Sequence, residues 1–223
     1  MGTKLKWSFL GRVEYPRALE IQKRLRDEIH QGVRTDTLLL LEHPPVITMG
    51  RSARVENVLV SEEDRRRCGV DFVRVQRGGD VTYHGPGQLV GYPIRRVGKS
   101  VRLHVAGMGE AIVQLLAGYG IESWWREDIP GVWTAEGKIA AVGVEVRDRI
   151  SIHGFAMNVS TRLSDFGMIV PCGLCAQITS MQALIGEVLC LDELAGELAP
   201  LLARQYGSEC EKISAQDVTR IQL

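Results

Sequence analysis

Apolar positions in the first part of the chain alternate between runs that suit strands and a spacing that suits helices. Short apolar runs predict strands at residues 5–9, 37–41 and 46–49. Between the first two, apolar residues recur at helical spacing among Lys and Arg, which predicts a helix from about Tyr15 that Gly32 ends. The prolines after the second strand cannot donate a ladder hydrogen bond, so they must end that strand.

Capping residues predict two further helices before the middle of the chain. Ser61, followed by three acidic residues, is typical of a helix start, and we expect Cys68 to end this helix and to pack inside the protein. A strand at 71–76 comes next. Ser100 then caps a long helix that ends near Gly118. The buried face expected for that helix comprises Leu103, Met108, Ile112, Leu115 and Leu116.

The next part of the chain is rich in strands. Residues 131–134 and 138–146 predict a hairpin with a Gly-containing turn, and 150–159 predict a strand with Ile152 and His153 on opposite faces. Small side chains crowd the last two strands, which leaves space above the sheet that suits an acyl chain. Close packing of a helix on the sheet is the alternative. These small residues are Ala140, Ala141, Gly143, Gly154 and Ala156.

The last quarter combines an irregular link with two closing helices. A link as long as 160–179 without regular structure is often functional. We expect the first helix to start at Thr179 or Ser180 and the second at Asp192. Beyond Gly207 the sequence is polar, which predicts a loosely held tail.

Composition narrows the classes of function. The 27 basic and 27 acidic residues balance, so nothing favours a nucleic-acid or membrane partner. The 45% hydrophobic content supports a sizeable core, and 223 residues are enough for one large domain or two small ones. No apolar run has the length of a signal peptide or membrane span. Five cysteines without a regular framework favour a reduced, cytoplasmic protein.

Residues 77–88, R-G-G-D-V-T-Y-H-G-P-G-Q, are the stretch with the most unusual composition. Its four glycines weaken any regular element, and glycine lets backbone approach a ligand closely. We expect a loop between two strands in which Arg77, Thr82 and His84 are able to face a carbonyl or carboxylate. A plain turn is the alternative. The stretch has neither the ending of a P-loop nor the G-x-G-x-x-G order before a helix.

Cys172 lies between Pro171 and Gly173, on a segment expected to be exposed and sharply turning, where a thiolate can meet a substrate. With Cys175 it forms a Cys-x-x-Cys pair, so zinc and redox roles are alternatives. Zinc would need two further ligands at suitable spacing, and a redox pair usually opens a helix early in a βαβ unit. A nucleophilic thiolate needs a nearby cation or base. Lys138 is the candidate, although a solvated lysine is usual at a strand start.

Five segments, in this order, resemble the lipoyl(octanoyl)transferase family. They are L-E-H-P-P-V-I-T-M-G-R at 41–51, the stretch at 77–88, K-I-A-A-V-G at 138–143, H-G-F-A-M-N at 153–158 and P-C-G at 171–173. The resemblance extends from about Leu38 into the last helices. Lipoate and biotin ligases share the fold and resemble the chain at the Gly-rich stretch, but they adenylate a free acid and lack the Pro-Cys-Gly nucleophile.

The resemblance implies that residues 1–223 form a single biotin/lipoate protein ligase-like catalytic domain of the α/β (α+β) class, with a mainly antiparallel sheet flanked by helices. It implies that an octanoyl group passes from octanoyl–acyl carrier protein, through a thioester on Cys172, to a lysine of a lipoyl domain. The implied acceptors are the acyltransferase subunits of 2-oxoacid dehydrogenases and the glycine cleavage H protein. Lys138 would lower the pKa of the thiol and act as acid and base, and no cofactor is expected.

We expect the substrate pocket to be lined by residues from three of these motifs: Arg77, Gly78, Gly79, Asp80, Val81, Thr82, Tyr83, His84, Ala141, Val142, Gly143, Gly154, Phe155 and Ala156. Two other functions are kept as alternatives. One is an ATP-dependent lipoate- or biotin-type ligase, and the other is a non-catalytic protein that binds lipoyl domains or acyl carriers.

Overall fold

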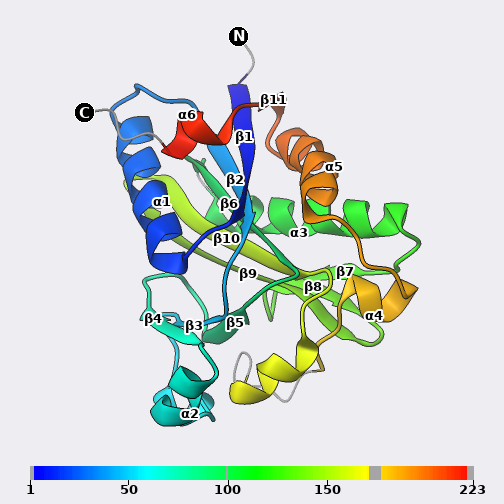
Figure 1. Cartoon of the computed structure of the whole chain (residues 1–223). Coiled ribbons are helices and arrows are strands. Elements are labelled where there is room, and N and C mark those ends of the chain that lie inside the picture. Colours follow the sequence, from blue (N-terminus) through cyan, green and yellow to red (C-terminus); the bar gives the residue numbers. More distant parts are fainter. Residues whose placement is uncertain (1–2, 99, 171–176, 220–223) are drawn as a thin grey trace.

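A large twisted sheet forms the centre of the protein in a computed structural model that describes residues 3–98, 100–170 and 177–219 (Figure 1). Eight strands follow the order β11-β1-β2-β6-β10-β9-β8-β7. Every pairing from β2 to β7 is antiparallel, and β1 runs parallel to both of its neighbours. The prediction of a mainly antiparallel sheet flanked by helices is confirmed.

The large sheet comprises β1 (Thr3–Arg12), β2 (Thr37–Glu42), β6 (Gln88–Arg96), β7 (Trp124–Arg126), β8 (Gly131–Thr134), β9 (Gly137–Arg147), β10 (Ile150–Asn158) and β11 (Ser208–Lys212). A small sheet has the order β4-β3-β5 and comprises β3 (Val46–Met49), β4 (Asp71–Arg74) and β5 (Val81–His84). The α-helices are α1 (Tyr15–His30), α2 (Glu62–Arg67), α3 (Val101–Gly118), α4 (Met181–Ile185), α5 (Leu191–Gln205) and α6 (Ala215–Thr219). Two short 3-10 helices are η1 (Val55–Asn57) and η2 (Leu163–Met168).

Both faces of the large sheet are covered, which explains the uninterrupted run of leucines in β2. Helices α3 and α5 lie on one face, and α1 and α6 on the other (Figure 1). Since successive strand residues point to opposite faces, Leu38 and Leu40 pack under α3 and α5, whereas Leu39 and Leu41 pack under α1. A strand buried on both faces needs apolar residues at every position.

The predicted helix starts are confirmed, with two errors of burial. Ser61 caps α2 and Ser100 caps α3, each through its hydroxyl oxygen. Cys68 at the end of α2 is exposed, because no residue of this helix is buried, so its predicted packing is wrong. The predicted burial of Leu103 is also wrong. This side chain is 74% exposed, because the buried residues of α3 begin one position later, at His104.

The stretch at 77–88 is not one continuous loop, as the sequence predicted, but contains β5. This strand pairs antiparallel with β3 to complete the small sheet. Its alternation buries Val81 and Tyr83 in a small apolar cluster with Phe166, away from the two clusters of the large sheet. The loop that remains, residues 77–80, lies over β9, where the Gly78 N–H donates to the Val144 carbonyl at 2.9 Å.

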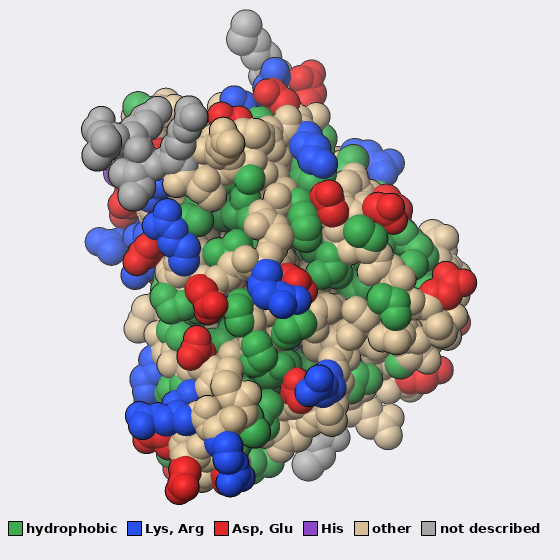
Figure 2. All heavy atoms as spheres, viewed as in Figure 1, with side chains coloured by type: hydrophobic (Ala, Val, Ile, Leu, Met, Phe, Trp, Pro, Cys, Tyr) green, Lys and Arg blue, Asp and Glu red, His purple; other side chains and the backbone are tan. Residues whose placement is uncertain are grey.

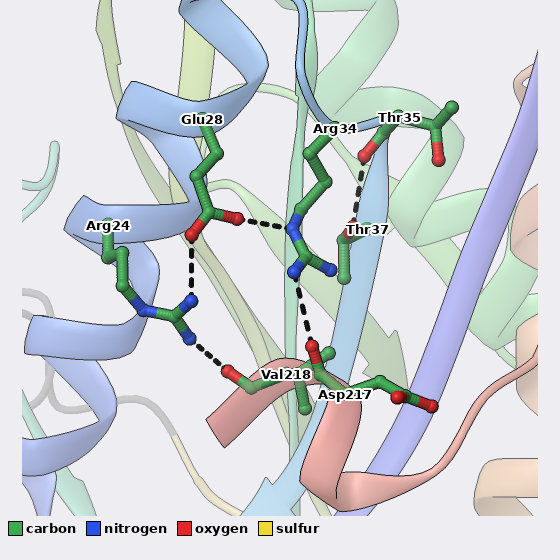
Figure 3. Close-up of polar contacts among 7 residues, drawn as sticks. All are labelled: Arg24, Glu28, Arg34, Thr35, Thr37, Asp217 and Val218. Atoms are coloured by element: carbon green, nitrogen blue, oxygen red, sulfur yellow. Dashed lines mark hydrogen bonds and ion pairs between the residues drawn. The ribbon is translucent and has the colours of Figure 1, made fainter. Parts of the chain in front are cut away.

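The polar segment that follows α5 is ordered by pairing, so the prediction of a loosely held tail is wrong. Strand β11 adds to the free edge of β1, and α6 packs beside α1. Arg24 and Arg34 both pair with Glu28, and they donate onward to the carbonyl oxygens of Val218 and Asp217 (Figure 3). An exposed edge strand has no buried apolar face, so its residues show no alternation that would predict a strand.

Charged side chains of both signs are interspersed over the face shown in Figure 2, with apolar side chains between them. This agrees with the balanced composition and shows no region of one sign on that face. Within the described ranges, no helix is both long and apolar enough to cross a membrane.

Candidate active site

A cavity of about 600 Å³ lies between the 77–80 loop, strands β9 and β10, and the start of α1. That volume is in the range of small-molecule sites. Most predicted pocket residues line it: Arg77, Gly78, Gly79, Asp80, Val81, Thr82, His84, Lys138, Ala141, Val142, Gly143, Gly154, Phe155 and Ala156. Residues from three distant motifs therefore meet at one place.

Two predicted residues do not line the described walls. Tyr83 points away from the cavity, because it alternates with His84 on β5, and its hydroxyl donates to Asp165 at 2.7 Å. Cys172 lies outside the described residues, as does Cys175. His43 and Arg51, which belong to the motif at 41–51, are absent from the described lining: His43 is fully buried and Arg51 is exposed.

Glycines in the floor of the cavity are required by close backbone approach. A Cβ on Gly143 would lie 2.9 Å from the Gly78 carbonyl oxygen, so the loop is seated directly on β9. A Cβ on Gly154 would lie 2.1 Å from the Gly91 carbonyl oxygen on β6. These small residues thus bring the loop and strands together, besides bordering the space that the sequence predicted above them.

Arg77 is directed into the protein, where it fixes the loop. Its guanidinium donates to both the carbonyl and the hydroxyl oxygen of Thr48, each at 2.9 Å, and to the Gly78 carbonyl at 3.0 Å. Asp80 accepts from the Asn57 amide at 2.6 Å. These bonds tie the 77–80 loop to β3 and η1. The expectation that Arg77 faces a carbonyl or carboxylate of a ligand stays a prediction, since the bonds described here are to atoms of this chain.

Lys138 is 4% exposed and lies in the wall of the cavity. Its stem crosses Gly131 on β8, where a Cβ would meet the Lys138 Cε at 2.3 Å and Nζ at 3.1 Å. The Nζ lies 5.5 Å from the centre of the Trp133 ring, within reach of a cation–π contact. A glycine and an aromatic ring on the neighbouring strand thus define where the ammonium group is held.

The backbone of Lys138 pairs with the residues that follow the undescribed segment. Its N–H donates to the Gln177 carbonyl at 2.8 Å, and its carbonyl accepts from the Thr179 N–H at 3.1 Å. On the other side of that segment, the Val170 N–H donates to the Asn57 carbonyl at 2.8 Å. Both flanks of residues 171–176 are therefore anchored, one of them directly to Lys138.

A chain of buried hydrogen bonds supports this pairing. His84 Nδ1 donates to Gln88 Oε1 at 2.8 Å, Gln88 Nε2 donates to Asn158 Oδ1 at 2.9 Å, and Asn158 Nδ2 donates to the Thr179 carbonyl at 3.0 Å. All these side chains are buried, so an unpaired group among them would be costly. These hydrogen bonds give Gln88 and Asn158 a structural role. Both residues belong to the sequence motifs, which by themselves indicate no function for them.

The opposite end of the cavity is lined by polar rings that stay neutral. Burial lowers the pKa of His84 to about 3 and raises the pKa of Tyr15 to about 12. The pKa of His153 is also lowered, chiefly by burial. Tyr92 lines the same end, and burial raises the pKa of its hydroxyl. These groups can donate and accept hydrogen bonds, but they hold no charge near neutral pH.

His153 departs from the face that strand alternation predicted. Its φ of 59° is left-handed, which is rare for a residue with a side chain. Its ring contacts Tyr15 and Tyr92, on the same side of the sheet as Ile152, and its N–H donates to Gln22 on α1 at 2.7 Å. The pairing between β6 and β10 is interrupted at this point, beside Pro93, which has no N–H to donate.

Sequence reasoning missed part of the lining. Tyr15, Tyr92, His153 and Val105 contribute from helices and strands whose predicted faces were assigned to the core or to solvent. Ser52, Val144 and residues 128–130 complete the described walls. Residues 128–130 precede the short strand at 131–134, and their position beside Lys138 depends on the β8–β9 pairing, which no local pattern specifies.

The chain matches the lipoyl protein ligase A/B catalytic domain over residues 14–201 and belongs to this family. An octanoyltransferase from Solibacter usitatus is 48% identical to it, covering 90% of this chain and 92% of the relative. One from Caldicellulosiruptor saccharolyticus is 43% identical, covering 98% and 95%. The predicted membership and the predicted acyltransferase class are confirmed.

Comparison with solved structures shows which fold the chain shares. A bi-partite lipoate protein ligase from Thermoplasma acidophilum superposes with a TM-score of 0.75 at 16% identity, over 97% of this chain and 89% of that one. Lipoate-protein ligase A bound with ATP gives 0.74 at 18%, over 98% and 91%. Biotin protein ligase from Aquifex aeolicus gives 0.54 at 15%, over 91% and 69%. The predicted ligase-like catalytic fold is confirmed.

Proposed function

We propose that this protein transfers an octanoyl group from octanoyl–acyl carrier protein to a lysine of a lipoyl domain, by way of a thioester on Cys172. The observation that carries the proposal is a buried lysine, Lys138, in the wall of a cavity of about 600 Å³, with its backbone paired to Gln177 and Thr179, which follow the Pro171-Cys172-Gly173 motif in the sequence. The octanoyltransferase relatives support the acyl group.

The reaction needs two acyl exchanges at the same thiol. In the first, the Cys172 thiolate attacks the thioester carbonyl, the bond to the donor sulfur breaks, and the donor thiol leaves with a proton. In the second, the acceptor amine attacks the Cys172 thioester, an amide forms, and the cysteine sulfur leaves as thiolate. Lys138 favours the thiolate by its charge and exchanges the protons. The amide product is more stable than a thioester, so no ATP is consumed.

The lining of the cavity supports an acyl substrate. Val142, Phe155 and Ala156 supply apolar wall, and neutral rings line the end far from Lys138. A hydrocarbon chain loses less by contact with uncharged rings than it would beside an unpaired buried charge. A free thiol at Cys172 also agrees with the reducing, cytoplasmic location expected from the cysteines.

Intact mass spectrometry tests the proposal directly. The protein mixed with octanoyl–acyl carrier protein should gain one octanoyl group, and an apo lipoyl domain should then remove it. Cys172→Ser should show no gain, while Cys175→Ser serves as the matched control and should acylate normally. An adduct on Cys172→Ser, or none on the unmodified chain, would refute the cysteine thioester.

The rival ligase function predicts a different requirement. A ligase would modify the lipoyl domain from free octanoate only when ATP is present. The same assay with octanoate and ATP in place of the acylated carrier protein separates the two functions. We expect no modification of the lipoyl domain under those conditions.

A further inference from the structure

A second cavity, of about 550 Å³, lies beside the one already described. Val105, Asp128 and Pro130 belong to the walls of both. The rest of its described wall comes from Val101, Arg102, Trp125 and Glu127. The two cavities therefore meet along a shared wall formed by α3 and the segment between β7 and β8.

The shared wall lies at the Lys138 end of the main cavity. Pro130 is bonded to Gly131, and the Lys138 stem lies directly across Gly131. The carbonyl oxygen of Ile129 accepts from the Trp133 indole N–H at 3.4 Å, which fixes the segment beside the ring that Lys138 Nζ contacts. The second cavity thus adjoins the reactive end and not the neutral end at His153.

An acyl transfer at a buried lysine needs space on both sides of the reacting carbonyl. The acyl chain occupies one side, and the group that carries the thioester sulfur must occupy the other. The main cavity continues from Lys138 toward Gly154 and can take the chain. What remains of the donor has to extend away from Lys138 in another direction, and the second cavity lies on the other side of the shared wall.

We propose that the second cavity binds the arm that carries the donor's thioester sulfur, an extended chain of methylene and amide groups. This rests on the proposed function and adds the donor's binding route to it. The side chains of Val101, Val105 and Trp125 offer apolar contact to the methylene groups. Arg102 and Glu127, paired across the rim and exposed, offer polar partners where the arm would emerge toward its carrier.

Two positions on α3 provide a matched pair of variants. Val101 lines the second cavity and no described part of the first, whereas Leu103 lines neither. Both are exposed apolar residues in the first turn of the helix, so tryptophan at either should be tolerated by the fold. Val101→Trp fills the second cavity, and Leu103→Trp adds the same bulk beside it.

The experiment compares acylation rates of Cys172 with two octanoyl thioesters that differ only in the arm. One donor is octanoyl-pantetheine, and the other is octanoyl-N-acetylcysteamine, whose short arm ends before the second cavity. We expect Val101→Trp to lower the ratio of kcat/KM for the long arm over the short arm by about tenfold, since bulk forced into a packed space is costly. Leu103→Trp should leave this ratio unchanged.

The two levels of the proposal fail in different ways. An unchanged ratio in Val101→Trp, or an equal fall in Leu103→Trp, would overturn the arm site while leaving the transferase function standing. Absence of an octanoyl adduct on the unmodified protein with either donor would overturn the proposed function, and the arm site with it.

Discussion

The two ends of the main cavity are built from opposite kinds of polar group. At one end is Lys138, held by Gly131 and Trp133 and paired through its backbone to the 177–179 segment. At the other end His153 lies opposite Val144, six residues along β9 from Lys138, which is about 20 Å at the rise of a strand. The rings around His153 are neutral because burial disfavours their charged forms.

This difference assigns proton exchange to one end of the cavity and selection of the acyl-chain length to the other. Proton exchange requires a group that can change its charge at a defined position, and the lysine end supplies it. The rings at the other end are neutral and the Arg77 guanidinium near them keeps its proton, so this end has no proton to exchange near pH 7, but it can limit the length of the chain that enters. The predictions below are designed to break this division or to sharpen it.

The largest effect is expected from removing the amine. Lys138→Ala should slow acylation of Cys172 by about 10²–10⁴-fold, the usual contribution of acid–base help. Lys138→Arg should restore the charge but not the proton transfer. The measurement is the pH dependence of iodoacetamide alkylation of Cys172, with acyl transfer assayed in parallel. A normal alkylation midpoint and normal transfer in Lys138→Ala would assign Lys138 to a merely structural role.

The next effect concerns the hydrogen-bond chain behind Lys138. Asn158→Leu removes the hydrogen bond to the Thr179 carbonyl and one of the two made by the Gln88 amide, which keeps its 3.3 Å bond to the Tyr83 carbonyl, at about 1–3 kcal/mol for a buried group that loses its partner. We expect lower stability and, because the 177–179 segment pairs with Lys138, about tenfold slower acylation.

Thr37→Val is the control for that variant, since it also deletes a buried hydroxyl hydrogen bond, to Thr35 at 3.0 Å, but at the far end of β2. It should lower stability without changing the rate of acylation at a temperature where both variants are folded. If the two variants slow acylation equally, the chain through Asn158 has no specific link to Lys138.

Chain-length preference tests the selective end. The structure makes Ala156→Leu a cleaner test than Gly143→Val, since a Cβ on Gly143 would displace the loop at Gly78. Extra bulk at Ala156 should cost longer chains about 1–3 kcal/mol and shift the preference from octanoyl toward hexanoyl donors. The assay compares kcat/KM for hexanoyl, octanoyl and decanoyl donors. An unchanged preference would locate the end of the chain elsewhere.

The smallest effect is a pH dependence of folding at the neutral end. The pKa values of His43 and His84 are lowered by burial to about 4 and about 3, below the roughly 6.5 of an unfolded chain. The unfolded state therefore binds more protons in this window, so stability present above pH 6.5 is lost as the pH falls toward 4.

Replacing the His84 ring isolates its contribution to the pH dependence of the unfolding free energy. His84→Gln should reduce the loss of unfolding free energy by up to about 1.4 kcal/mol per pH unit between roughly pH 6 and 4. Urea unfolding at a series of pH values measures it for both proteins. Identical slopes would mean that His84 charges in the folded state, and the cavity would then have an ionisable group at both ends.

Much of the fold followed from local sequence signals. The leucine run of β2, the helical spacing of α1 and the serine caps of α2 and α3 each depend on few neighbours, and each was predicted. Elements defined by distant pairing were not. β5 is too short for its own periodicity to dominate a glycine-rich stretch, and β11 with α6 shows mostly polar residues.

The candidate site was predicted best where it depended on motifs and worst where it depended on orientation. Residues from three separated segments, including Gly78, Lys138 and Gly154, do line one cavity. The sequence could not show that Arg77 turns inward to Thr48, because its partners lie on another strand. Nor could it place His153, because alternation assumes an extended backbone and this residue has a positive φ.

The parallel pairing of β1 with β11 has a consequence for how the chain is made. Thr3 lies beside Ser208, so synthesis places about two hundred residues between the two strands. Until the second emerges from the ribosome, the outer edge of the first has unpaired N–H and C=O groups and can pair with another nascent chain. Contacts this far apart also slow folding, since a long loop must close first. Strand β11 therefore covers the outer edge of β1 only late in synthesis, and from then on that edge can no longer pair with another chain.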